Sequence, residues 1–409
     1  MFLNALGSFL FKGVRMVCVL DLGTFVGQVY KGGRDSLESM SFEITAKDGS
    51  ARVGRLKTAH GWIETPFFMP VATRGTGKYL TPNDYKEIES PAIICNSYLL
   101  SCRPGIEIIE KAGGIHGFMN YSGVITTDCG GFQVSRKFHQ QTTRRGIHFK
   151  DPFFCKNDFI TPGHIMEIQN TIGADIVMGL DDMPLYGASL EEVQKSMENT
   201  HRWMAESKKA HKREGQLLFG ICQGGFFQET REESAKVINS MGFDGNAIGG
   251  IAIGEPREDM YHAIKWALPH LDEDKPRYLM GVGSPVDVVE CVSRGIDFFD
   301  SVYPTQSGRH NTLYTSKGKL YIDGAVYRDD LGPIDSSCGC HACKNYSRAY
   351  IHHLIKIKEP MAKRLKSIHN LFFMRELMDG IRKAIREGRL SAFKKEIVKR
   401  FGDGKGRLK

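Results

Sequence analysis

Short runs of apolar, often β-branched residues recur from Ile93 onward, and each run ends abruptly in a polar residue or a glycine. Seven stretches follow this pattern: 92–96, 124–128, 175–181, 217–223, 247–250, 278–283 and 297–300. Amphipathic stretches usually separate them, and their periodicity predicts helices over 190–212, 228–241 and 286–294. Continuous apolar runs that alternate with helical patterns indicate parallel strands buried on both faces.

An eighth apolar stretch around 67–71 brings the count to that of an α/β barrel of the TIM type, (β/α)8. A doubly wound open sheet is the alternative fold. In a barrel, the carboxyl ends of all strands gather around one pocket, which would bring together Asn96, Asp128, Asp181, Gln223, Gly250 and Asp300. A lone aspartate at a strand end is usually a helix cap or turn residue. Three aspartates joined by Gln and Gly favour a shared site.

Three cysteines within six residues, Cys338, Cys340 and Cys343, form a candidate metal site. Zn²⁺ prefers thiolate and imidazole ligands in closed, tetrahedral structural sites. His341 lies inside the turn, where geometry disfavours it, so the fourth ligand is sought among His352, His353 and His369. The alternative is a group of reduced, unliganded cysteines. Because the cluster follows the last predicted strand, the metal is expected to be structural rather than catalytic.

Composition narrows the class of protein without naming its activity. The chain has 409 residues, of which 41% are hydrophobic, as in ordinary globular proteins. The ten cysteines are too few and too scattered for a disulfide scaffold and indicate a reducing compartment. The formal charge is +8, and residues 381–409 carry eleven Lys/Arg against three Asp/Glu, a surplus of eight. This basic end suits either a phosphate backbone or simple solvation.

Four regions are expected along the chain. Residues 1–39 are predicted to be a poorly ordered extension, or upstream sequence ahead of a true start at Met40. Their apolar stretch is too short and too interrupted for a membrane span, although weak membrane association or targeting is an alternative. The other regions are a catalytic barrel over 40–330, a zinc-binding subdomain over 331–375, and a basic helix and tail over 376–409 that completes the barrel.

Several motifs resemble the tRNA-guanine transglycosylases, also called queuine tRNA-ribosyltransferases, and most closely their bacterial branch. Similar segments extend from about Glu43 to about Phe401. The most specific are TDCGGFQV (127–134), GICQG (220–224), GGIAIGE (249–255), YLMGVG (278–283), GIDFFD (295–300) and SRAYIHHL (347–354). Their order and number make an accidental resemblance implausible.

The resemblance implies a role for each matching position. Asp300 matches the family's nucleophile, and Asp128 matches the general acid/base beside it. The residues that match the base pocket are Asp181 and Gln223 at the base edge, Gly250, Ile251 and Ala252 in the backbone wall, Phe132 and Met280 on the two base faces, and Asn96 on the ribose side. Arg309 matches a tRNA contact. One structural Zn²⁺ per chain is implied at Cys338, Cys340, Cys343 and His369.

The implied activity is that of a pentosyltransferase of queuosine biosynthesis. It would exchange the guanine at the anticodon wobble position of tRNAs with GUN anticodons for a 7-deazaguanine, preQ1 or queuine, through a covalent Asp–ribosyl intermediate. A carboxylate can attack the ribose carbon while a second carboxyl moves the proton of the base. A single-stranded anticodon loop allows the base to leave its stack. A cytoplasmic homodimer without stable membrane association is expected.

The sequence also departs from the family pattern. Gln306 stands where bacterial members commonly have Arg, Met183 where they have Cys, Leu99 where they have His, and Cys129 where they have Ser. Met183 and Cys129 are expected to border the base pocket, so the identity of the incoming base stays open. The alternatives are exchange of queuine itself, archaeal-type exchange of preQ0 into the tRNA D-arm, a non-catalytic RNA-binding subunit, and a zinc hydrolase on a barrel.

Overall fold

The computed structural model describes residues 10–11, 14–15, 42–130, 139–151, 153 and 156–402. The chain divides into two units, 1–41 and 42–409. In the first unit, β1 (Leu10–Phe11) pairs antiparallel with β2 (Val14–Arg15). The candidate chemistry lies in the second unit.

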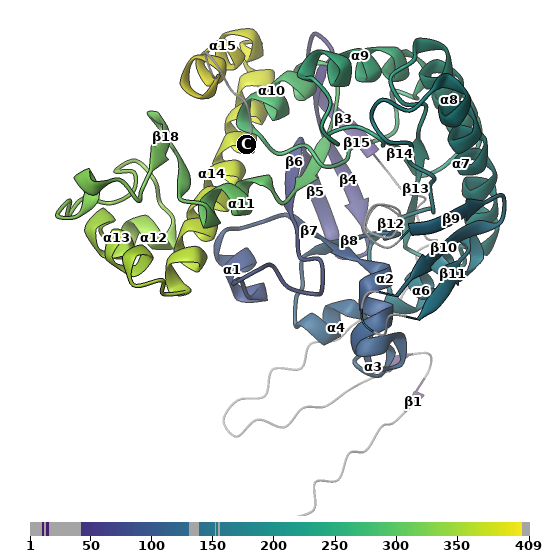
Figure 1. The fold of residues 1–409 in the computed structure, drawn as a ribbon, viewed down its shortest axis with the longest axis horizontal. Helices are drawn as coiled ribbons and strands as arrows, with labels where there is room; N and C mark the ends of the chain where they lie inside the picture. Colours follow the sequence, from purple (N-terminus) through teal and green to yellow (C-terminus); the bar gives the residue numbers. More distant parts are fainter. Residues whose placement is uncertain are drawn as a thin grey trace, which may run out of the picture. The chain divides into compact units, whose positions relative to one another are not determined.

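Eight parallel strands form the centre of the second unit (Figure 1). They are β6 (Phe67–Pro70), β7 (Ala92–Asn96), β8 (Val124–Asp128), β12 (Ile176–Met178), β13 (Leu217–Cys222), β14 (Gly245–Ile248), β15 (Arg277–Leu279) and β16 (Phe298–Ser301). Their order is β6-β16-β15-β14-β13-β12-β8-β7. A parallel bridge between Val71 and Ile94, with Ala72 N donating to Ile94 O at 2.7 Å, joins the two outermost strands. The predicted α/β barrel is therefore confirmed.

Aromatic and β-branched residues fill the interior of the barrel. Every residue of β7 and β13 is buried, as strands that are covered on both faces require. The Phe298 ring stacks on Phe67 at 4.7 Å and on Tyr278 at 4.6 Å between ring centroids, and the Phe219 ring meets it edge-on. Large side chains therefore pack the centre of the barrel, as is usual in this fold.

Helices follow the strands and surround the barrel (Figure 1). The predicted helices correspond, within two residues, to α7 (Leu190–Ala210), α8 (Gln228–Ser240) and α10 (Pro285–Ser293). The longer remaining helices are α6 (Pro162–Ile172), α9 (Arg257–Ala267), α13 (Arg348–Lys356), α14 (Met361–Arg386) and α15 (Leu390–Phe401). The short ones are α1 (Pro82–Glu87), α2 (Ser97–Leu100), α3 (Ile106–Lys111), α4 (Ile115–Met119), α11 (Tyr303–Arg309) and α12 (His341–Asn345).

The described part of this unit also contains two antiparallel sheets and an antiparallel hairpin outside the barrel, which were not predicted. They are the sheet β3 (Phe42–Asp48), β4 (Ala51–Thr58), β5 (Gly61–Thr65), the sheet β9 (His139–Thr143), β10 (Gly146–Lys150), β11 (Asn157–Ile160), and the hairpin β17 (Thr312–Thr315), β18 (Gly318–Tyr321). The burial of β3 alternates strictly between half-buried and exposed residues, so its apolar signal is diluted. The hairpin leads from the barrel into the cysteine-rich region.

Buried charges at the amino ends of the strands are paired. Arg52 of β4 donates to Asp297, which precedes β16, with 2.6 Å between Nη2 and Oδ2, and both side chains are at most 2% exposed. Asp175, which precedes β12, accepts from His60 Nδ1 at 2.6 Å and His116 Nε2 at 3.0 Å. These contacts tie β4, the β4–β5 turn and α4 to the barrel. Asp175 opened the run predicted over 175–181, but it lies at the opposite end of the strand from Asp181.

Helix α14 passes from the cysteine-rich region to the barrel wall. It carries His369 in its first half and contacts β3, β4 and β6. It runs without interruption across residue 375, where the zinc subdomain was expected to end. Among the residues with described coordinates, no helix combines the length and apolar character that crossing a membrane requires.

Candidate active site

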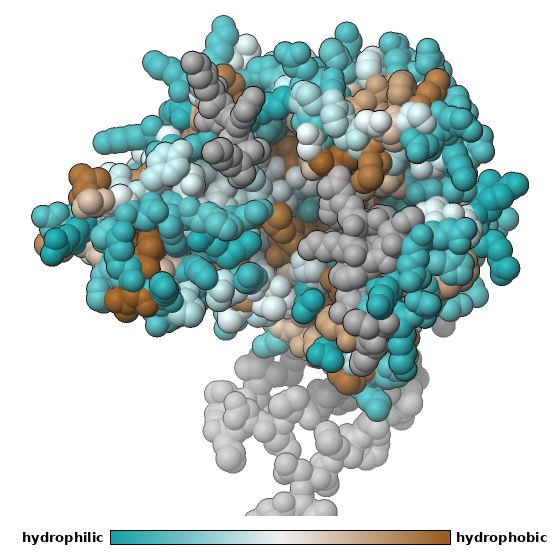
Figure 2. Space-filling view, in the orientation of Figure 1, coloured by the Kyte–Doolittle hydropathy of each residue, from teal (hydrophilic) through white to brown (hydrophobic). Residues whose placement is uncertain are grey.

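A pocket of about 280 Å³ opens at the carboxyl ends of the barrel strands. Eight of the residues singled out from the sequence line it: Asn96, Asp128, Asp181, Gly250, Ile251, Ala252, Met280 and Asp300. Met183 and Cys129 line it too, as expected. Figure 2 shows apolar residues near the centre of the face in view and mostly hydrophilic residues around its periphery. The pocket thus combines apolar walls with a few carboxylates, as small-molecule sites do.

Asp300 is held by two donors at the end of β16. Tyr278 Oη donates to Asp300 Oδ1 at 2.5 Å, and Gly281 N donates to the same oxygen at 3.0 Å. Burial raises the pKa of Asp300 above its ordinary value, and the Tyr278 hydroxyl partly offsets this shift. The carboxylate is therefore oriented through one oxygen. Tyr278 was foreseen only as part of an apolar run, because a strand tyrosine carries no signal of its partner.

Asp128 ends β8, one strand away from Asn96 in the same register. Its Oδ1 accepts from Gly130 N at 3.1 Å, and the Asn96 side chain hydrogen-bonds to it. Burial, followed by the negative charge of Asp300, raises the pKa of Asp128 to about 7. Two carboxyls that repel one another in a shared pocket titrate separately, so one can hold a proton while the other is ionised.

Asp181 and Gln223 form a second polar pair in the same region. Gln223 Nε2 donates to Asp181 Oδ2 at 2.6 Å, and the thiol of Cys129 donates to Oδ1 at 3.6 Å. Burial raises the pKa of Asp181 to about 6, although both donors lower it. Asp181 is then largely ionised at neutral pH and accepts hydrogen bonds. Cys129, which departs from the family pattern, thus keeps a donor to this carboxylate.

Glycine is required where β14 approaches Gln223. A Cβ on Gly250 would lie 2.3 Å from Gln223 Oε1, and the φ of +67° at Gly250 disfavours any side chain. Beyond it, Ala252 also has a positive φ, of 57°. Glu255 accepts from Ala252 N at 2.5 Å and Ile253 N at 2.8 Å. This backbone therefore forms a fixed wall of the pocket.

Three residues singled out from the sequence are not among those that line the pocket: Gln223, Phe132 and Arg309. Gln223 is fully buried and reaches the pocket-lining Asp181 through its side-chain amide. Phe132 lies outside the described residues. Arg309 is the last residue of α11, which begins shortly after Asp300. Burial lowers the pKa of its guanidinium. Its role as a tRNA contact stays a prediction.

The cysteine-rich region brings four candidate ligands together. His369 Nδ1 lies 3.7, 3.5 and 3.4 Å from the sulfurs of Cys338, Cys340 and Cys343. Zinc bonds of about 2.3 Å to sulfur and about 2.0 Å to nitrogen place such donors about 3.5 Å apart in a tetrahedron. His369 Nε2 contacts Tyr314 O at 2.7 Å, which fixes the ring. The group can hold a metal ion, and of the candidates for the fourth ligand His369 completes it.

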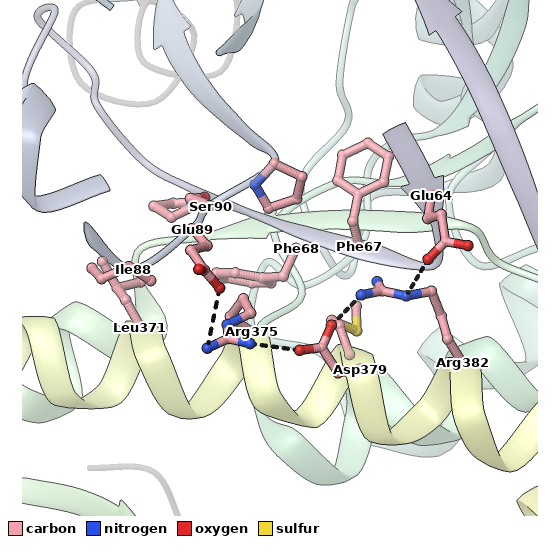
Figure 3. A pocket seen from close by; sticks show the side chains of 13 residues that line it. Glu64, Phe67, Phe68, Ile88, Glu89, Ser90, Leu371, Arg375, Asp379 and Arg382 are labelled. Carbon is pink, nitrogen blue, oxygen red and sulfur yellow. Dashed lines mark hydrogen bonds and ion pairs between the residues drawn. The ribbon is translucent and has the colours of Figure 1, made fainter. Parts of the chain in front are cut away.

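A second cavity, of about 190 Å³, lies between α14 and the β5–β6 region (Figure 3). Its charged side chains neutralise one another. Arg375 pairs with Asp379 at 2.7 Å and with Glu89 at 3.6 Å, and Arg382 pairs with Asp379 and, at 3.4 Å, with Glu64. Each of these charged side chains is therefore occupied in an ion pair. These contacts fasten α14 to the barrel.

Replacing Asp128 by Asn should make the stability of the protein less dependent on pH. A carboxyl whose pKa is higher in the folded than in the unfolded state gives stability that is complete below about pH 4 and is lost as the pH rises through about 7. Asn cannot ionise. We expect Asp128→Asn to raise the Tm at pH 8 by about 3 °C or more, with a smaller gain at pH 5. Thermal unfolding at both pH values measures this, and equal gains would contradict it.

Comparisons with known proteins agree with this geometry. The model of the family described as queuine tRNA-ribosyltransferase matches residues 47–403. A queuine tRNA-ribosyltransferase of Thermoanaerobacter pseudethanolicus is 48% identical over 370 residues, which cover 90% of this chain and 99% of that protein. Proteins of the same name from Caldanaerobacter subterraneus and Bacillus mycoides are 47% and 46% identical, over 89% and 90% of this chain and 98% of their own lengths. The chain therefore belongs to the queuine tRNA-ribosyltransferase family, a family of pentosyltransferases.

Proposed function

We propose that this chain exchanges the guanine at the wobble position of tRNAs with GUN anticodons for a 7-deazaguanine. The observation that carries the proposal is the meeting of Asp128 and Asp300 in one pocket, at the ends of β8 and β16. The relatives that match nearly the whole chain are named for ribosyl transfer to tRNA with queuine. Two carboxyls suffice for the two proton transfers and the two displacements at the ribose carbon that such an exchange requires.

In the first step, the ionised carboxylate of Asp300 attacks the anomeric carbon of the ribose. The bond from this carbon to guanine breaks, guanine leaves with the electron pair, and Asp128 supplies the proton that it needs. The ribose is now an ester of Asp300. The hydrogen bonds from Tyr278 and Gly281 both reach Oδ1, so we assign the attack to Oδ2.

In the second step, the 7-deazaguanine gives a proton to Asp128 and attacks the same ribose carbon. The ester bond breaks, and Asp300 leaves as a carboxylate. Two inversions restore the original configuration, and both carboxyls return to their starting protonation states. The pKa of about 7 at Asp128 suits a group that must first donate and then accept a proton near neutral pH.

Asp181 and Gln223 are proposed to recognise the edge of the base. The ionised Asp181 faces the pocket as an acceptor for the N1–H and amino groups of a guanine-like ring. The Gln223 amide uses one N–H on Asp181, and its second N–H is available to the base carbonyl. Gly250, Ile251 and Ala252 are proposed to line the ring with backbone groups, and Met280 and Phe132 to cover its two faces. Asn96 and Arg309 are assigned to the ribose and to the tRNA.

The Cys338, Cys340, Cys343 and His369 group is proposed to hold one structural Zn²⁺ per chain, within a zinc-binding subdomain over 331–375. None of these four residues is among those that line the pocket. The metal when bound would cross-link the α12 loop to α14, and no step of the exchange uses it. The homodimer and the cytoplasmic location remain predictions.

The incoming base is expected to be preQ1 rather than queuine or preQ0. The pocket walls include the bulky Met183, Ile251 and Ile253, which leave little room for the cyclopentenediol of queuine. PreQ1 carries only a small cationic aminomethyl group, which suits a pocket with three carboxyls. We expect its kcat/KM to exceed that of queuine by roughly 10-fold or more.

The measurement is incorporation of each base into a tRNA with a GUN anticodon, beside a control tRNA with adenine at the wobble position. Label in the control tRNA, or label that maps to the D-arm, would overturn the proposal in favour of the archaeal-type reaction. Absence of any exchange would favour a non-catalytic RNA-binding subunit.

A further inference from the structure

Arg231 of α8 is a fully buried cation that the proposed mechanism does not use. Its guanidinium donates to three backbone carbonyls. Nε and Nη2 donate to Gly225 O at 3.1 and 2.6 Å, and Nη1 donates to Cys222 O at 3.1 Å and Gly249 O at 3.0 Å. Among the residues whose coordinates are described, no carboxylate is hydrogen-bonded to Arg231. Such a group is an unusual occupant for a protein interior.

Burial of a cation is unfavourable, and it lowers the pKa of Arg231, an effect that the charge of Glu255 offsets only in part. A methionine or leucine would fill the same space without this penalty. The guanidinium differs from them because it presents five N–H donors in one rigid plane. Only arginine can reach three carbonyls on two chain segments at once. The contacts are therefore best explained by a requirement for a fixed backbone geometry.

Two of the three carbonyls lie at the ends of the neighbouring strands β13 and β14, and the third, Gly225 O, lies three residues beyond the end of β13. Both segments carry residues that are proposed to contact the base. Cys222 ends β13 directly before Gln223, and Gly249 follows β14 directly before Gly250. Two further residues of α8 reinforce the contact, since Thr230 Oγ1 donates to Gly224 O at 2.6 Å and Ser234 Oγ accepts from Gln223 N at 3.0 Å. One turn of α8 thus holds both strand ends from behind the pocket.

There is little free space between the ends of β13 and β14. A single added carbon at Gly250 would come within 2.3 Å of Gln223 Oε1, so the Gln223 amide and the Gly250 backbone are already in close approach. Gln223 also carries the hydrogen bond to Asp181. A shift of β13 against β14 by a few tenths of an ångström would move the amide, the glycine wall and the carboxylate relative to one another.

We propose that Arg231 is a positioning residue for base recognition, which fixes the β13 and β14 ends so that Gln223 and Gly250 meet the same base. The inference rests on the proposed function, because it assumes that these residues bind the exchanged base. Arg231 acts through the backbone and does not touch substrate. Its loss should therefore weaken binding of the base more than binding of the tRNA.

The test compares Arg231→Met and Arg231→Lys with a matched control, Arg277→Met. Arg277 is also a buried arginine whose guanidinium donates to a backbone carbonyl, Leu271 O at 2.8 Å, but it starts β15 at the opposite end of the barrel. We expect Arg231→Met to raise the KM for the free base roughly 10-fold or more, while the KM for tRNA changes less than about 2-fold. Arg277→Met should lower the Tm and leave the KM for the base unchanged.

Arg231→Lys keeps the charge but cannot span the three carbonyls, so its KM for the base should rise several-fold. If Arg231→Met does not fold, this variant decides the question alone. An unchanged KM for the base in a folded Arg231 variant, or an equal rise in Arg277→Met, overturns the inference. Failure of the unmodified protein to exchange any base would instead overturn the proposed function.

Discussion

Replacing Asp300 by Asn should abolish base exchange, with a fall in kcat of at least roughly 10⁴-fold, because an amide cannot form the ester to ribose that is assigned to this carboxylate. Asn has nearly the shape of Asp and can still accept from Tyr278 Oη and Gly281 N. Folding and metal binding should therefore survive. The measurement is incorporation of labelled guanine into tRNA, together with metal content and Tm. Undiminished incorporation by Asp300→Asn would refute the assigned nucleophile.

Trapping the covalent intermediate is a second, independent test of Asp300 as the nucleophile. When the unmodified protein is mixed with tRNA and quenched in denaturant, an RNA-linked band should appear on a gel, and Asp300→Asn should give none. Tyr278→Phe is the matched control, since it removes a hydrogen bond to Asp300 and keeps the carboxylate. It should slow exchange by roughly 10-fold and still form the adduct. An adduct that persists in Asp300→Asn would place the ester on another residue.

Replacing Cys340 by Ala should remove the metal and destabilise the region around α12 and α14. Cys340 is 1% exposed, and its sulfur lies 3.5 Å from His369 Nδ1. Three remaining ligands bind Zn²⁺ far more weakly than four, and loss of a structural zinc site removes several kcal/mol of folding free energy. We expect the metal content to fall from about one ion per chain to near zero, and the Tm to fall by roughly 10 °C or more.

Cys291→Ala provides the control for this experiment. Cys291 is a fully buried free cysteine of α10, outside the metal cluster, so the change deletes the same atoms from a different part of the protein. It should lose some stability from the small cavity and keep its full metal content. Elemental analysis after dialysis distinguishes the two variants. If Cys340→Ala retains one zinc per chain, the four-residue site is wrong.

The barrel and the convergence of the polar strand ends could be predicted because both follow from short, continuous patterns in the sequence. Each central strand is a continuous apolar run, and β7, for example, ends with Asn96 as predicted. Parallel topology then brings the residues at the carboxyl ends to one side without any knowledge of individual contacts. The cysteine cluster was equally local, since three of its four ligands fall within six residues.

Features that depend on pairing between distant residues could not be predicted. Tyr278 looks like any other strand tyrosine until its hydroxyl is found 2.5 Å from Asp300. Arg231 lies in an amphipathic helix where an arginine is normally solvent-exposed, and only the packed structure buries it against two strand ends. The sheet of β9, β10 and β11 joins three strands of only four or five residues, and only β10 alternates between apolar and polar residues. These partners follow from tertiary structure alone.

Asp297 directly precedes β16 and Asp300 lies near its carboxyl end, three residues later, yet the two carboxylates have opposite surroundings. Asp297 is neutralised by Arg52 at the amino end of the strand, whereas Asp300 forms no ion pair with any residue that the structure describes. A protein engineer can thus treat the two ends of β16 as separate parts. Substitutions near Asp300 can be screened for new base specificity. The buried ion pair at Asp297 stays intact and keeps the strand in place while such substitutions are made.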